Sequence, residues 1–181
     1  FLGTILAFLI FSNLSSKPTE TVQEVSAVNG TGIVLPSHFT ERKITDPSTA
    51  RDAINDVADT LGIVSVEDEL GTADCSTVLG DTYYSFPQVY RGIPVYGRKV
   101  TVSADADSEA ALLTSGFYPI ENLSVEAKIT QNDAEKIVAG LYPGEADIYV
   151  NNLVIFSLDK TNPELAWKIS VHQNNSWESV F

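Results

Sequence analysis

Few residues of this chain have the types and spacing that chemistry requires. A hydrolytic zinc site uses paired ligands on one helical face, as in H-E-x-x-H, but His38 and His172 stand far apart and outside any such pattern. The chain contains neither a G-x-S-x-G nucleophile motif nor a phosphate-binding Gly-Lys-Ser/Thr loop. The sequence therefore predicts no catalytic, cofactor-binding or metal-binding residue in this chain.

The remaining reactive side chains give no stronger pattern. Cys75 is the only cysteine, which excludes an intrachain disulfide and a cysteine-rich zinc site. The acidic runs Glu67-Asp68-Glu69 and Asp105-Ala106-Asp107 lack the ligand order of an EF-hand, so solvated loops are the simpler interpretation. A small hydrolase built from scattered carboxylates stays open as an alternative, to be tested by whether polar groups converge in a cleft.

Charge and hydropathy narrow the class of protein. Twenty-four acidic residues against eleven basic ones give a formal net charge of −13, and such a surface repels nucleic acids and anionic membranes. Residues 1–11 are almost wholly apolar but too short to span a bilayer. With the small residues that follow, they predict a signal-peptide remnant over 1–16 and hence a secreted protein, extracellular or periplasmic. A buried core segment is the alternative, and the absence of methionine indicates a fragment or a trimmed chain.

The middle of the chain contains the first predicted helix and the first predicted strand. Residues 17–45 are polar with little periodicity, and we expect a loosely ordered lead-in there. Asp46-Pro47 then predicts a helix start, an apolar stripe follows at helical spacing, and Gly62 is placed for a left-handed C-cap. After Cys75 the period changes to two, with Tyr84, Phe86, Gln88 and Tyr90 on one face.

The second half repeats this order. Thr130 is the predicted N-cap of a helix with its apolar residues at Ala134, Ile137, Val138 and Leu141. Extended runs are expected over 147–158, 165–171 and 177–181. The sequence therefore predicts an α+β fold of two small units, each a helix packed on an antiparallel sheet, over residues 46–120 and 121–181.

One segment of the first unit resembles a known motif. Residues 84–97 read YSFPQVYRGIPVYG, and they resemble the fungalysin/thermolysin propeptide domain, in which Gln-x-Tyr-x-Gly is followed by an apolar residue, Pro-Val, another apolar residue and Gly. The residues that carry this first motif are Phe86, Gln88, Tyr90, Gly92, Pro94, Val95 and Gly97. Gly92 is expected to make a tight turn and Gly97 to permit a bulge. Ser85 and Pro87 depart from the residues common in relatives, and Pro87 predicts a strand edge or a bulge.

The second unit resembles a PepSY domain, which follows that motif in the same propeptides. Residues 164–171, ELAWKISV, are similar to its Leu-Ala-Tyr/Trp-Lys-Val strand, carried here by Leu165 and Trp167. Relatives continue past the position of Phe181, so the resemblance implies that this domain is truncated at its C-terminus and that a peptidase domain lies downstream.

The two resemblances imply a function. They imply the propeptide of a secreted thermolysin-like zinc metallopeptidase, acting as an intramolecular chaperone and cleft-blocking inhibitor until proteolysis removes it. The partner would be the downstream peptidase domain of the same precursor, and zinc and calcium would be held there. A free-standing secreted or cell-envelope binding module, or a protease inhibitor acting in trans, is the alternative. A downstream H-E-x-x-H would distinguish the two.

Overall fold

The computed structural model of the chain describes residues 23–27, 30–142, 146–157, 162–173 and 176–181. The predicted signal-peptide remnant, 1–16, lies outside the described residues, as does the start of the predicted lead-in. Everything stated below concerns the described ranges.

The first part of the chain forms six strands and three short helices. In chain order these are β1 (Gln23–Ala27), β2 (Gly30–Leu35), α1 (Pro47–Asp56), α2 (Ala58–Leu61), α3 (Val66–Glu69), β3 (Asp74–Val78), β4 (Asp81–Tyr90), β5 (Ile93–Ala104) and β6 (Ala110–Ser115). The second part forms α4 (Gln131–Leu141), β7 (Asp147–Phe156), β8 (Glu164–Gln173) and β9 (Ser176–Val180). The predicted α+β class is therefore confirmed.

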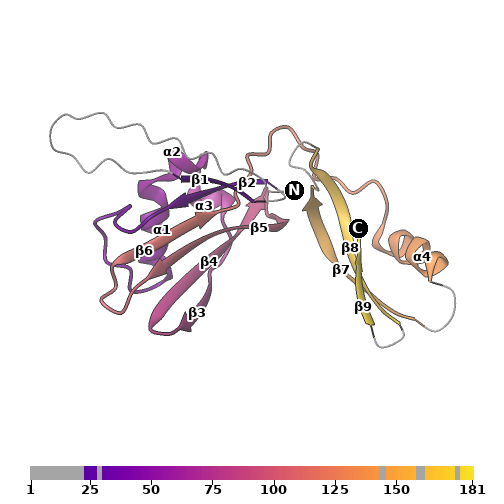
Figure 1. The fold of residues 1–181 in the computed structure, drawn as a ribbon. Helices are drawn as coiled ribbons and strands as arrows, with labels where there is room; N and C mark the ends of the chain where they lie inside the picture. The colour runs from indigo at the N-terminus through magenta and orange to yellow at the C-terminus, as the bar shows by residue number, and fades with distance from the viewer. Residues whose placement is uncertain (1–22, 28–29, 143–145, 158–161, 174–175) are drawn as a thin grey trace, which may run out of the picture.

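The strands form a mostly antiparallel sheet, with nine strands in the part of the chain that the structure describes. Its order is β1-β2-β6-β5-β7-β8-β9. Off this path, β4 pairs with β5 and with β3. The two halves meet where β5 and β7 run parallel at one residue pair, Val95 and Ile155. In Figure 1, α1–α3 cover the first half of the sheet, and α4 lies on the side of β7–β9 that faces away from the first half.

The start of α1 follows directly from its sequence. The Asp46 carboxylate accepts the backbone N–H of Thr49 at 2.9 Å, and the Thr49 hydroxyl accepts the backbone N–H of Asp46 at 3.1 Å, which completes a capping box. Ala50, Ala53 and Ile54 are buried against the sheet. The predicted single helix is divided at Val57, where the backbone leaves helical geometry at φ −120° and ψ 13°, and α2 then ends at Gly62 with φ 72°. Gly62 thus makes the left-handed C-cap that the sequence predicts.

Part of the predicted lead-in is ordered sheet. The expectation of a loosely ordered segment over 17–45 is wrong for residues 23–27 and 30–35, since β1 pairs with β2 and β2 pairs with β6. Leu35, Phe39 and Ile44 are buried in the main core. The strand was missed because its apolar run is short, and its pairing partner β6 is supplied by a distant part of the chain.

The helix of the second half uses only part of its apolar stripe. Thr130 caps α4 by accepting the backbone N–H of Asp133 at 3.2 Å, as predicted. Ala134 and Val138 are buried against β8, but Ile137 and Leu141 are 56 % and 64 % exposed. The second half therefore has a much smaller core than the first, and α4 keeps an apolar flank in solvent.

Candidate functional site

The motif that the sequence singled out forms the β4–β5 hairpin and its continuation. Tyr90 pairs with Ile93 across a two-residue loop, Arg91 and Gly92, which have φ values of 49° and 79°. Positive φ at both loop residues defines a type I′ turn, whose twist matches that of the flanking strands. The predicted tight turn at Gly92 is thus present.

Gln88 lies inside the molecule and holds another backbone segment. Only 2 % of its surface is exposed. Its Nε2 donates to the carbonyl oxygen of Tyr118 at 2.6 Å, and its Oε1 accepts the Tyr118 backbone N–H at 3.0 Å. One amide therefore satisfies both backbone groups of Tyr118 and fastens the segment after β6 to β4.

Phe86 is a core residue with a cation on its ring. Its side chain is 1 % exposed, and the Arg51 guanidinium carbon lies 5.0 Å from the ring centroid. Arg51 also donates to the carbonyl oxygens of Val66 and Gly71 at 2.8 and 2.6 Å, next to the short α3. The helical pattern places Arg51 on the solvent face, but the structure makes it the link between α1, α3 and β4.

Gly97 and Pro94 lie where β5 leaves β4. Val89 pairs with Pro94 and Pro87 pairs with Lys99, so a single residue of β4, Gln88, stands opposite four residues of β5. Gly97 has φ 70°, which allows the bend. Pro87 borders this bulge, as the sequence predicts. Ser85, the other residue that departs from the family motif, forms a hydrogen bond between its hydroxyl and that of Thr101 at 2.9 Å.

The bulge directs Val95 into the junction between the halves. Val95, Ile120 and Ile155 form a separate buried cluster, against which Tyr90 and Leu165 pack. Leu165 belongs to the predicted motif of the second unit, so the two predicted motifs meet here. Trp167, two residues further along β8, faces the α4 side and donates its indole N–H to the Ile129 carbonyl oxygen at 3.1 Å.

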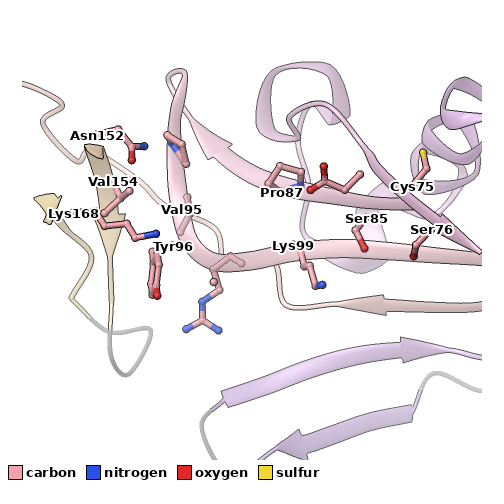
Figure 2. Close-up of a pocket in the computed structure, with 14 residues that line it drawn as sticks. Cys75, Ser76, Ser85, Pro87, Val95, Tyr96, Lys99, Asn152, Val154 and Lys168 are labelled. Atoms are coloured by element: carbon pink, nitrogen blue, oxygen red, sulfur yellow. The ribbon is translucent and has the colours of Figure 1, made fainter. Parts of the chain in front are cut away.

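A cleft of ≈ 530 Å³ lies between the helix-free faces of the two halves. Figure 2 shows Tyr96 from β5 close to Val154 and Lys168 from the second half, with Lys99 further along β5. Three basic side chains, Arg98, Lys99 and Lys168, line it together with one carboxylate, Asp74. The Lys168 ammonium lies 5.2 Å from the centroid of the Tyr96 ring. This cleft brings residues of both halves together, and no sequence motif predicts it because its lining residues are scattered along the chain.

The histidines and the cysteine do not assemble into a reactive site. The His172 ring stacks on Trp177 with centroids 4.8 Å apart, and its Nδ1 lies 3.6 Å from Asp147 Oδ2. Cys75 is exposed. Among the described residues, no group of three or more His, Cys, Asp or Glu side chains could hold a metal ion.

Asp56 and Tyr84 are among the groups outside the cleft whose pKa values are shifted. Hydrogen bonds from Arg42 lower the pKa of Asp56, and burial raises the pKa of the Tyr84 hydroxyl. Both belong to the packing of the first half. No helix in the described ranges is long and apolar enough to cross a membrane.

Comparison with known proteins supports the first resemblance. The family model "Fungalysin/Thermolysin Propeptide Motif" matches residues 74–117, which run from the start of β3 to just beyond β6. The match shows that this segment, less than half of the chain, is similar to that propeptide motif. Curated proteins give no match.

A solved structure resembles the chain only loosely. The "Bacillus megaterium YpeB C-terminal domain" shares 12 % sequence identity and aligns over 88 % of this chain and 81 % of that one, with a TM-score of 0.39. A TM-score of this size carries no argument about function. Whether the residues of the two predicted motifs contact a peptidase stays a prediction.

Proposed function

We propose that this chain is the propeptide of a secreted thermolysin-like zinc metallopeptidase, acting as an intramolecular chaperone and as an inhibitor until proteolysis removes it. The observation that carries the proposal is the family match over residues 74–117, with the matched motif folded as an intact hairpin. Zinc and calcium would be held by the downstream peptidase domain. This chain would supply binding surface alone.

The physical basis of such a role is linkage between binding and folding. A partner that binds the native peptidase but not its unfolded chain shifts the equilibrium toward the folded form, and filling the cleft excludes substrate. A stable interface of this kind buries at least about 1,000 Å² and uses aromatic anchors.

The structure narrows the choice of anchors. Tyr84 and Phe86 are buried in the core and are unavailable to a partner. Exposed aromatic residues are Tyr96, Tyr149, Trp177 and Phe181, at 40 %, 51 %, 63 % and 39 % exposure. The ring centroids of Tyr96 and Phe181 lie 4.6 Å apart, and those of Tyr149 and Trp177 lie 5.6 Å apart. These two exposed pairs are the proposed anchors.

Refolding and inhibition of the downstream peptidase domain test the proposal. The domain is denatured and refolded with and without an equimolar amount of this chain, and recovered peptidase activity is measured after the chain is digested. Native peptidase is separately titrated with the chain. We expect higher recovery and dose-dependent inhibition at micromolar concentration or below.

A double variant, Tyr149→Ser with Trp177→Ser, tests the anchors, and Leu79→Ser is the control at an exposed apolar residue of the β3–β4 turn. We expect weaker inhibition from the double variant only. A wild-type chain that neither inhibits the peptidase nor assists its refolding would contradict the proposal and favour a free-standing binding module.

A further inference from the structure

The cleft between the two halves is positively charged in a strongly acidic protein. The whole chain has a formal net charge of −13, but the cleft has three cationic side chains against one carboxylate, a local charge of +2. Arg98 and Lys99 come from β5, and Lys168 comes from β8. A charge distribution that opposes the net charge so strongly indicates a surface for an anionic partner.

The fold itself places these cations together. The bulge opposite Gln88 and the positive φ of Gly97 interrupt the pairing of β5 with β4, next to Val95, which pairs with Ile155 of the second half. Lys168 reaches the same point from β8, with its ammonium over the Tyr96 ring. Figure 2 shows Lys168 and Tyr96 side by side, with Lys99 further along β5.

The three cations of the cleft form no ion pair within the described ranges, a property that they share with Arg91 and Lys128. Arg42, Lys43, Arg51 and Lys136 each lie within ion-pair distance of an Asp or Glu. No such pair joins Arg98, Lys99 or Lys168 to any residue within the described ranges. Their charges are therefore available to a ligand.

The backbone of the cleft favours an extended polypeptide as that ligand. Among the residues that the structure describes, Tyr96, Gly97 and Arg98 have no partner in the strand register, although β5 is paired before and after them. Unpaired strand residues present N–H and C=O groups to an added strand, and this is a common mode of peptide recognition.

We propose that this cleft binds an extended acidic segment of a polypeptide, with its carboxylates on Arg98, Lys99 and Lys168. An acidic segment, rather than an apolar one, fits because three unpaired cations line the cleft. The identification of the bound segment with a part of the peptidase domain rests on the proposed function. The preference of the cleft for an acidic peptide does not depend on the proposed function.

The first arm of the test uses defined probes and so does not depend on the peptidase. Binding of fluorescein-labelled decaglutamate to the 181-residue chain is measured by anisotropy at 50 mM and 300 mM NaCl, with decaglutamine and the oligonucleotide dT10 as comparison probes. The cleft variant carries Arg98→Gln, Lys99→Gln and Lys168→Gln. The matched control carries Arg91→Gln, Lys128→Gln and Lys136→Gln, which removes the same charge outside the cleft.

We expect decaglutamate to bind wild type and the control, and to bind the cleft variant about tenfold more weakly, since each exposed ion pair contributes modestly. Binding should weaken at 300 mM NaCl, and decaglutamine should bind poorly. Equal binding of decaglutamate to the cleft and control variants would overturn the proposal. Tighter binding of dT10 than of decaglutamate at the same residues would also overturn it, in favour of a nucleic-acid site.

The second arm repeats the comparison with the purified peptidase domain. The cleft variant should bind it more weakly than the control does, with a smaller dependence on salt. If decaglutamate behaves as expected and the wild-type chain does not bind the peptidase, the cleft proposal stands and the proposed function fails. Circular dichroism of both variants checks that each is folded.

Discussion

Gln88 shows how one side chain can decide the path of a distant segment. Its buried amide forms hydrogen bonds with both backbone groups of Tyr118. A buried polar group costs free energy unless it is paired, so the amide and the Tyr118 backbone depend on each other. The segment after β6 is thereby held against β4, and from there the chain passes to the second half.

Replacing Gln88 with Leu should lower the free energy of unfolding by about 1–3 kcal/mol, because the Tyr118 N–H and C=O lose their partners. The measurement is urea denaturation followed by circular dichroism. Gln131→Leu, at the exposed start of α4, is the control and should change stability by less than about 0.5 kcal/mol. Equal effects of the two substitutions would show that the Gln88 hydrogen bonds contribute nothing.

Gly92 and Gly97 have positive φ with open space where a Cβ would lie, so backbone strain is the main penalty of substitution at either residue. Gly92→Val and Gly97→Val should each cost about 1–3 kcal/mol. Gly140→Val is the matched control, since Gly140 lies in α4 and also has open space around it. In a full precursor, the first two variants should also reduce the yield of active peptidase. Unchanged stability and maturation in both would contradict the prediction.

At the scale of elements, α1 is fixed to the chain before it by a polar cluster. The Nε–H of Arg42 donates to Asp56 Oδ2 at 2.7 Å, and its Nη2 donates to Asp56 Oδ1 at 3.1 Å. The Thr40 hydroxyl also donates to Asp56 Oδ2, at 2.7 Å. The cluster joins the end of α1 to the segment that follows β2. It therefore helps to hold β2 in the sheet.

Asp56 should make stability depend on pH. The Arg42 hydrogen bonds lower its pKa in the folded state, so its contribution is present above the unfolded pKa of about 3.9 and is lost as pH falls through the folded value. Asp56→Asn should cost about 0.5–1.5 kcal/mol at pH 7 and much less at pH 2.5. Thermal melts at both pH values measure this. Asp52→Asn, on the exposed face of α1, should show no such difference.

At the scale of the whole molecule, two cores of unequal size are joined by a small third cluster. Val95, Ile120 and Ile155 form that junction, and the β5–β7 pairing is limited to one residue pair. Both tryptophans, Trp167 and Trp177, lie in the second half, so tryptophan fluorescence reports on that half alone. This allows the coupling between halves to be measured.

Val95→Ala should lower the midpoint of the fluorescence-detected unfolding transition, at a cost of about 1–3 kcal/mol, although Val95 lies in the first half. Val102→Ala is the control on the same strand, because Val102 is also buried but belongs to the main core. It should act mainly on the transition seen by circular dichroism. Equal shifts of the fluorescence midpoint in both variants would mean that the molecule unfolds as one unit and that the junction has no special role.

Local patterns were sufficient to predict several features of this fold. The Asp46 and Thr130 caps, the left-handed Gly62, the alternation from Tyr84 to Tyr90 and the turn at Gly92 all depend on a few neighbouring residues. Such features are set by short-range hydrogen bonding, backbone sterics and side-chain alternation, which a sequence contains in full. The α+β class and the bulge beside Pro87 follow from the same rules.

Contacts between distant segments were decided by the tertiary structure. Residues 30–35 became a strand because β6 offers them an edge, and Ile137 of α4 is exposed because β7–β9 cover only one side of that helix. The Gln88–Tyr118 hydrogen bonds and the meeting of Val95 with Leu165 likewise join residues far apart in sequence. The same holds for the cationic cleft. Composition determined that this protein is acidic, but only the meeting of the two halves brought Arg98, Lys99 and Lys168 to one cleft.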